Sequence, residues 1–190
     1  MNEDILDRAY TRSVDIHRLA SHFTRRRYVH LPGLVRAERA ARLLESTEGL
    51  ARRRVECGLE NVSWDEQELV VGDPGYEFCR SPRLTQLIRM LVGTTVGPPV
   101  CWTSCYSVGE YINPHRDRGG TAQLLLCLKS PLTSSQGGSL ILEGAELFLS
   151  PGDAVLFEAT RLEHHTTPLV ASEVDPAPTR TVLVARYYSA

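Results

Sequence analysis

Short runs of β-forming residues, separated by turn residues, fill the chain from Val100 to its end. Turns rich in Ser, Pro and Gly at 131–138 and 151–153 separate several of these runs. Strands so short and so closely spaced are typical of a β-sandwich or β-barrel, because a helix-based fold needs longer periodic segments. We predict strands at residues 101–108, 111–117, 123–128, 139–142, 146–149, 154–157 and 181–188.

The first half of the sequence has helical rather than alternating periodicity. Amphipathic patterns predict helices at 13–23, with Ser13 as N-cap, at 37–50 and at 83–92, with one short strand at 28–31. Residues 57–78 show no clear period, so we interpret 56–77 as a loop that covers the mouth of the barrel. We therefore expect one domain over 1–190, with helical support and lid elements in 1–96 and a β-core in 97–190.

Composition narrows the classes of protein and partner. The 190 residues are 42% hydrophobic and carry a net charge of −2, so we expect neither a membrane partner nor a nucleic-acid partner drawn by overall charge. The five cysteines form no CxxC pair, which argues against a zinc ribbon and a secreted disulfide framework. The N-terminal residues lack the apolar stretch of a signal peptide, and we expect a cytoplasmic protein. The oligomeric state is left open.

Metal-ligating residue types gather in the β-rich half. His115 and Asp117 are two residues apart, so on a strand both side chains point to the same face. With a second histidine, they would complete the two-histidine, one-carboxylate set that binds Fe(II) and leaves positions open. His164 and His165 are the candidates for that second histidine. Because neighbouring side chains on an extended strand point in opposite directions, at most one of them reaches the metal.

Several ordered segments resemble one enzyme superfamily, the 2-oxoglutarate/Fe(II)-dependent dioxygenases, which include prolyl-4-hydroxylase-like members. The similarity extends from Trp102 to the C-terminus and is carried by the segments CYSVGEYINPHRD, GGSLIL, PGDAVLFE, HHTTPL and TRTVLVARYY. It implies a mainly β fold with N-terminal helices, namely a double-stranded β-helix of the jelly-roll or cupin-like kind. It also implies Fe(II) as cofactor, 2-oxoglutarate as cosubstrate and O₂ as oxidant.

The resemblance also selects a metal ligand set. The distal histidine of the family usually has a proline four positions later, and Pro168 stands four residues after His164. The implied catalytic and metal-binding residues are therefore His115, Asp117 and His164. Because Asp117 is present instead of alanine or glycine, the family's halogenase variant is disfavoured and hydroxylation is the expected outcome.

The same resemblance implies a cosubstrate site. A basic residue on a strand after the distal histidine holds the far carboxylate of 2-oxoglutarate in this family, and Arg180 fits that position. An arginine suits the task because its planar fork binds a carboxylate through two hydrogen bonds. Arg186 is the second choice. Tyr106 matches a tyrosine that often donates to 2-oxoglutarate, although it fits an aromatic position in the core equally well.

Three functions remain as hypotheses. The first is hydroxylation of an unactivated C–H bond in a small molecule, such as a free amino acid or a biosynthetic intermediate. The second is the same chemistry on a protein side chain or an alkylated nucleic-acid base. The third, from another class, is a cupin-like barrel that binds a metal or ligand without oxygenase chemistry. Slow turnover of 2-oxoglutarate without substrate distinguishes the first two from the third.

Overall fold

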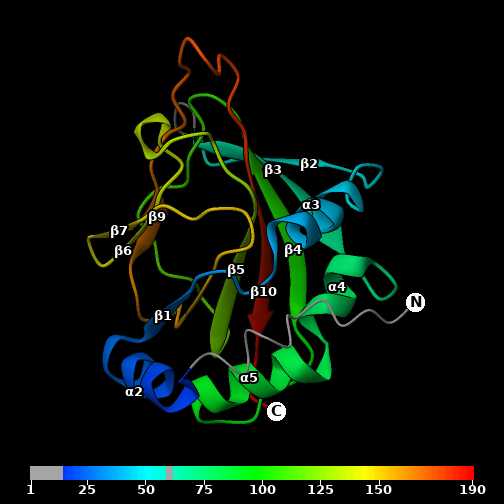
Figure 1. Ribbon diagram of the computed structural model, residues 1–190, viewed down its shortest axis with the longest axis vertical. Helices are drawn as coiled ribbons and strands as arrows, with labels where there is room; N and C mark the ends of the chain where they lie inside the picture. Colours follow the sequence, from blue (N-terminus) through cyan, green and yellow to red (C-terminus); the bar gives the residue numbers. More distant parts are fainter. Residues whose placement is uncertain (1–14, 59–61) are drawn as a thin grey trace.

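Two antiparallel sheets face each other in the computed structural model, which describes residues 15–58 and 62–190 (Figure 1). The large sheet has seven strands in the order β1-β8-β5-β10-β4-β3-β2, and the small one has three in the order β7-β6-β9. The strands are β1 (Tyr28–Leu31), β2 (Arg53–Glu56), β3 (Ser63–Leu69), β4 (Val100–Tyr106), β5 (Ala122–Lys129), β6 (Leu140–Leu142), β7 (Ala145–Leu147), β8 (Ala154–Phe157), β9 (His164–Thr166) and β10 (Arg180–Tyr187).

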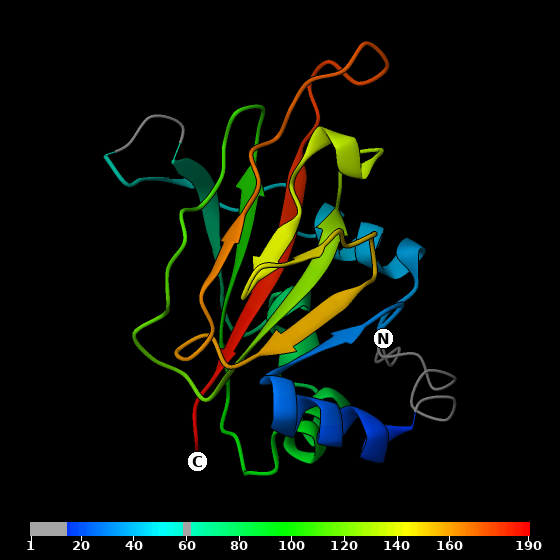
Figure 2. The ribbon, with the colours of Figure 1, turned by 90° about the vertical axis from the view of Figure 1, so that its left-hand side faces the viewer.

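The helices cover the face of the large sheet that points away from the small sheet (Figure 2). They are α2 (Ile16–Arg26), α3 (Ala37–Glu45), α4 (Pro74–Cys79) and α5 (Pro82–Val92), with one 3₁₀ turn, η1 (Ser134–Gln136), in the loop after β5. The predicted N-cap Ser13 lies outside the described residues; Asp15 caps α2 by accepting a hydrogen bond from Arg18 N at 3.0 Å. None of the helices in the described ranges has the length and hydrophobicity that crossing a bilayer requires.

Strand β10 shows how alternation divides the interior into two compartments. Leu183, Ala185 and Tyr187 pack in the main core beneath the helices. Val182 and Val184 point the other way, into a second hydrophobic cluster shared with the small sheet. Successive side chains on a strand point to opposite faces, so the helix layer leaves one face of the large sheet free to line an internal site.

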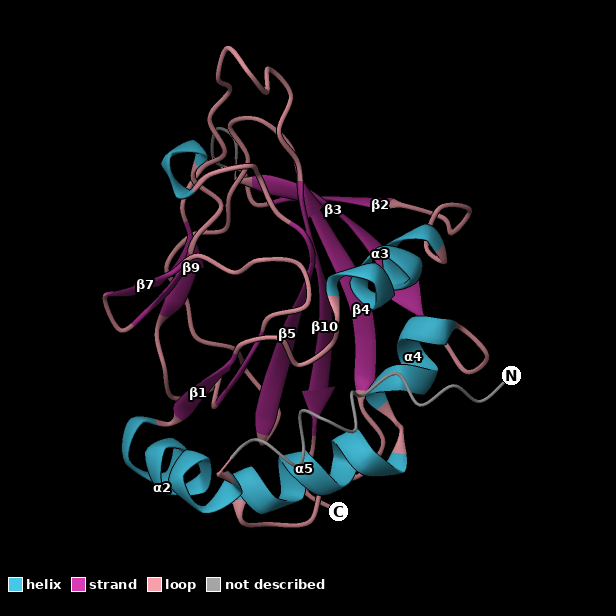
Figure 3. Ribbon diagram, viewed as in Figure 1, coloured by secondary structure: helices cyan, strands magenta, loops and turns pink. Residues whose placement is uncertain are grey.

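Two sequence predictions of secondary structure are wrong. Residues 111–117 form no strand: Pro114 lacks an N–H, and the bridge of His115 with His164 is an isolated one that does not extend into a ladder. The predicted loop at 56–77 contains β3 and most of α4, as Figure 3 shows. With β1 and β2, β3 brings three strands from the first 96 residues into the large sheet, so that part of the chain is more than helical support.

Two turn glycines make a matched test of backbone geometry. Gly152 has φ +97°, and a Cβ added there would lie 2.3 Å from the carbonyl oxygen of Val35. Gly144, in the hairpin between β6 and β7, has φ +80° with no atom within 4 Å of an added Cβ. We expect Gly144→Ala to lower the free energy of unfolding by about 1 kcal/mol through strain alone. Gly152→Ala adds a main-chain clash, and we expect a loss of about 3 kcal/mol.

Urea unfolding of both variants measures this difference. Equal losses would mean that the 151–153 turn moves away from the loop at Val35 without penalty.

Candidate active site

His115, Asp117 and His164 converge on one point between the two sheets. Each offers one ligand atom, and these atoms all lie within 4.8 Å of one another. Backbone hydrogen bonds hold the two histidine segments together: His115 N donates to His164 O at 3.1 Å, and His164 N donates to His115 O at 2.9 Å. Asp117 N donates to Ala159 O at 2.9 Å. The residues thus meet as expected; His164 begins strand β9, whereas His115 and Asp117 lie on a loop that is held by single backbone contacts instead of a regular strand.

Both histidine rings present the same nitrogen to the interior of the site. Nδ1 of His115 donates to Asn113 O at 2.7 Å, and Nδ1 of His164 donates to Leu162 O at 3.0 Å. A carbonyl oxygen only accepts, so Nδ1 carries a proton in both rings, and in a neutral ring this leaves the lone pair on Nε2. Burial lowers the pKa of His164, which favours the neutral imidazole. Neutral rings fixed in this way by backbone carbonyls are typical of metal ligands.

The carboxylate of Asp117 has one oxygen with incomplete partners. Its Oδ2 is buried and forms no hydrogen bond within the described parts of the chain. His164 Nε2 lies 3.8 Å from this oxygen. Arg186 Nη2 lies 2.8 Å from it and forms an ion pair with it. A buried carboxylate oxygen needs strong compensation, so this atom is suited to a cation placed between it and the two imidazoles.

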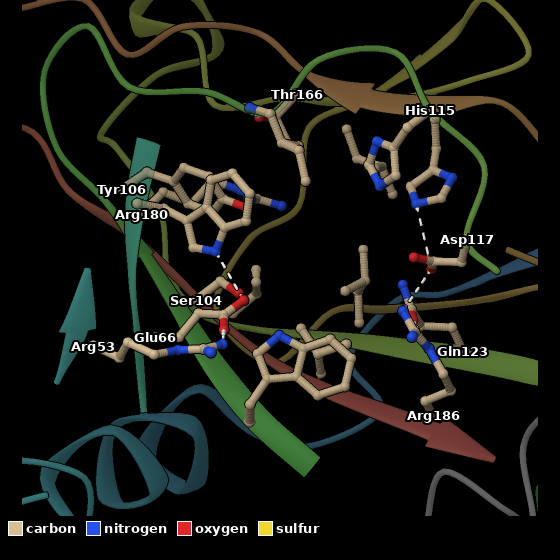
Figure 4. Close-up of a pocket in the computed structure, with 18 residues that line it drawn as sticks. Arg53, Glu66, Ser104, Tyr106, His115, Asp117, Gln123, Thr166, Arg180 and Arg186 are labelled. Carbon is tan, nitrogen blue, oxygen red and sulfur yellow. Dashed lines mark hydrogen bonds and ion pairs between the residues drawn. The ribbon is translucent and has the colours of Figure 1, made fainter. Parts of the chain in front are cut away.

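A pocket of about 360 Å³ extends from this cluster across the face of the large sheet that the helices leave uncovered (Figure 4). Residues directly opposite each other on antiparallel strands point to the same face of the sheet. Cross-strand neighbours on the face that the helices leave uncovered therefore line the pocket wall together. The lining residues are Arg53, Trp64, Glu66, Trp102, Ser104, Tyr106, Ile112, His115, Asp117, Gln123, Leu125, Leu140, His164, Thr166, Arg180, Val182, Val184 and Arg186.

Arg180 and Tyr106 form the end of the pocket opposite Asp117 (Figure 4). Arg180 is only 3% exposed, and its guanidinium carbon lies 5.3 Å from the centre of the Tyr106 ring. Among the described residues, no carboxylate forms an ion pair with this buried arginine. Burial raises the pKa of Tyr106 to about 12, so its hydroxyl stays protonated and able to donate near neutral pH. This end is therefore suited to an anion.

Arg186, the second choice for the cosubstrate site, lies at the other end of the pocket from Arg180. Its Nε donates to Gln123 Oε1 at 3.0 Å, and its guanidinium carbon lies 5.2 Å from the centre of the Trp102 ring. The contact with Asp117 places it beside the candidate metal ligands. The two arginines of β10 thus mark opposite ends of one pocket.

Sequence reasoning missed the part of the wall formed by β2 and β3. Arg53 and Glu66 line the pocket, and Trp64, predicted only as a lid residue, does so as well. Arg118, next to Asp117 in the sequence, is not among the lining residues. The signal available in the sequence was the period-two spacing of Trp64 and Glu66, which places both side chains on one face of a strand.

Comparison with known proteins shows the fold. The sequence matches no family profile, and no curated protein matches it. Similar solved structures include a Pseudomonas putida prolyl-4-hydroxylase (TM-score 0.75, 13% identity, 93% of this chain and 100% of that one). A 2OG-Fe(II) oxygenase family oxidoreductase from Burkholderia pseudomallei has a TM-score of 0.73 at 15% identity (93% and 92%). The α-ketoglutarate-dependent epimerase SnoN of nogalamycin biosynthesis has 0.71 at 18% (92% and 83%). The predicted double-stranded β-helix is confirmed.

Proposed function

We propose that this protein is an Fe(II)- and 2-oxoglutarate-dependent dioxygenase that hydroxylates a C–H bond of a small molecule. One observation carries the proposal: a His-Asp-His cluster and a buried arginine, which has no carboxylate partner among the described residues, lie at opposite ends of one pocket. The similar solved structures include a 2OG-Fe(II) oxygenase family oxidoreductase and an α-ketoglutarate-dependent epimerase, which supports the same chemistry.

His115, Asp117 and His164 would hold the metal. Two imidazoles and one carboxylate are the donor set that non-haem Fe(II) oxygenases use, and the buried Oδ2 of Asp117 fits a cation. When bound together, Fe(II), 2-oxoglutarate and O₂ supply the oxidant for hydroxylation. The backbone carbonyls that accept from Nδ1 keep both rings in the binding tautomer.

Arg180 and Tyr106 would hold the far carboxylate of 2-oxoglutarate. The guanidinium offers two parallel N–H donors and cannot lose its proton, and the neutral Tyr106 hydroxyl supplies a further donor. Ser104 and Thr166 also line the pocket and offer hydroxyls. Because Arg180 is almost fully buried, water does not compete for these donors, and the cosubstrate is fixed in one orientation.

The size of the pocket favours a small substrate. Its volume of about 360 Å³ lies at the lower end of the roughly 300–1,000 Å³ that small-molecule pockets occupy. The ten non-hydrogen atoms of 2-oxoglutarate would occupy much of this space, so only a small molecule, or one end of a larger one, fits beside it. A protein side chain would have to enter alone, with its backbone at the rim.

Anaerobic titration with Fe(II), with and without 2-oxoglutarate, tests the proposal. We expect a weak visible metal-to-ligand charge-transfer band only when both are present, and slow conversion of 2-oxoglutarate to succinate once O₂ is admitted. Iron binding without the band and without turnover would instead indicate a metal-binding barrel of the cupin-like kind.

A further inference from the structure

A third charged group lies in the pocket, away from the His-Asp-His cluster and next to the Arg180 end, where the ring centres of Trp64 and Tyr106 are 6.1 Å apart. It consists of the Glu66 carboxylate and the two side chains that it binds (Figure 4). Glu66 Oε1 accepts a hydrogen bond from Trp64 Nε1 at 2.9 Å, and Oε2 pairs with Arg53 Nη2 at 2.6 Å. The proposed iron and 2-oxoglutarate chemistry uses none of these three side chains.

The position of Glu66 in the sheet points its carboxylate into the pocket. Glu66 lies opposite Ser104 of β4 and opposite Arg53 of β2, and Val182 of β10 lies opposite Ser104. All four residues line the pocket, as the shared face of such a row requires. Only 18% of the Glu66 side chain is exposed, so its negative charge is held at the wall of an interior space.

Arg53 is a weak partner for this carboxylate. Its side chain is 77% exposed and leaves the pocket at the rim. Ion pairs that include so exposed a side chain contribute little to stability, because water solvates the freed guanidinium well. Trp64 and Glu66 are held in place, whereas Arg53 can move into solvent, so an incoming cation can take the place of Arg53 on Oε2.

On the other face of the β2–β3 hairpin, a different arginine already joins the hairpin to the rest of the protein, so the Arg53–Glu66 pair is not needed for that purpose. Arg54 pairs with Asp65, its cross-strand neighbour, at 3.2 Å. Arg54 also donates to Ser63 Oγ at 2.6 Å and binds the buried Glu110, which joins the hairpin to the loop before His115. The Arg53–Glu66 pair makes no comparable connection to another segment among the described residues and faces the pocket.

We infer that Glu66 selects a positively charged nitrogen of the substrate, and that Arg53 occupies this subsite when no substrate is bound. The inference rests on the proposed function and names its substrate class: a small molecule that carries a guanidinium or ammonium group. Trp64 orients the carboxylate, and the substrate cation replaces the Arg53 guanidinium on Oε2.

The layout of the sheet also sets the shape of such a substrate. Across the sheet, Glu66 is aligned with Ser104 of β4 and Val182 of β10. Arg186, at the metal end, lies four residues further along β10 than Val182, which corresponds to roughly 13 Å along the strand. Glu66 itself lies two strands away from β10. The charged nitrogen is therefore recognised at a distance from the carbon that faces the metal, which favours an elongated molecule.

The two tryptophans of the chain make binding directly measurable. The sequence contains only Trp64 and Trp102, and both line the pocket, so intrinsic fluorescence reports on this space. The probes are L-arginine and L-citrulline, which differ in having a charged guanidinium or a neutral urea. L-lysine and L-norleucine repeat the comparison for an ammonium group. Titrations use the full chain loaded anaerobically with Fe(II) and 2-oxoglutarate.

Opposite effects of two substitutions are the expected signature. Glu66→Gln weakens L-arginine binding about tenfold or more and removes the preference over L-citrulline, since a charge-assisted hydrogen bond is lost. Arg53→Ala removes the internal competitor and tightens L-arginine binding by about twofold to fivefold. Glu68→Gln removes an exposed carboxylate of the same strand outside the pocket lining and leaves both affinities unchanged.

Three results would overturn the inference. The first is equal affinity of the unmodified chain for L-arginine and L-citrulline. The second is no binding of L-arginine by either the unmodified chain or Arg53→Ala. The third is a decrease in L-arginine affinity in both Glu66→Gln and Arg53→Ala. The charge-transfer band needs no amine, so its presence alongside any of these results leaves the proposed function standing. If the band is absent, the same fluorescence titrations on the metal-free chain still decide whether Glu66 binds cations.

Discussion

His164→Ala is expected to lower the affinity for Fe(II) by more than about 100-fold, while His165→Ala leaves it nearly unchanged. Loss of a partner that only orients a metal ligand already weakens binding about 10- to 100-fold, so loss of the ligand itself has a larger effect. The two histidines are adjacent on β9, but His164 is buried in the pocket and His165 is not among the lining residues. They form a matched pair that differs mainly in the direction of the side chain.

Anaerobic Fe(II) titration, followed by assays of 2-oxoglutarate turnover, measures the difference. Circular dichroism of both variants shows whether the β-structure is retained. Unchanged iron affinity in His164→Ala, or equal loss in both variants, would contradict the assignment of His164 as a ligand. The same outcome would leave Asp117 Oδ2 without an explanation for its missing hydrogen bond.

The fold was predictable where a segment carries its own periodicity. The predicted strand at 154–157 coincides with β8, and the predicted helix at 83–92 matches α5 within one residue. Strands β2 and β3 were missed because their sequences, RRVE and SWDEQEL, are mostly charged and polar. They are strands because β3 pairs with β4, a tertiary contact that outweighs local preference.

The candidate site was predictable only where a motif identifies residues one by one. His115, Asp117 and His164 were found together, although the strand assumed for the first two does not exist. The contact between Arg186 and Asp117 joins residues far apart in sequence and leaves no periodic signal. Glu66 was missed because residues on an unrecognised strand were interpreted as part of a lid.

Arg180→Ala is expected to raise the 2-oxoglutarate concentration needed for half-saturation by about 100-fold or more. Removing one partner of a buried, hydrogen-bonded charge pair weakens binding by about 2–5 kcal/mol, because the remaining charge is left unpaired. Here the remaining charge would be the far carboxylate of 2-oxoglutarate beside the Tyr106 ring. Arg180→Lys keeps the positive charge but loses the fork, so we expect an intermediate requirement.

Stability distinguishes this role from a structural one. Arg180 is 3% exposed and has no carboxylate partner in the described ranges, so without 2-oxoglutarate its buried charge opposes folding. We therefore expect cofactor-free Arg180→Ala to unfold at the same temperature as the unmodified protein or a higher one, and to lose the stabilisation that added 2-oxoglutarate gives. A structural arginine would show the reverse, a lower unfolding temperature with the ligand effect intact. An unchanged 2-oxoglutarate requirement would move the cosubstrate role to Arg186, whose pairing with Asp117 would then have to break on binding.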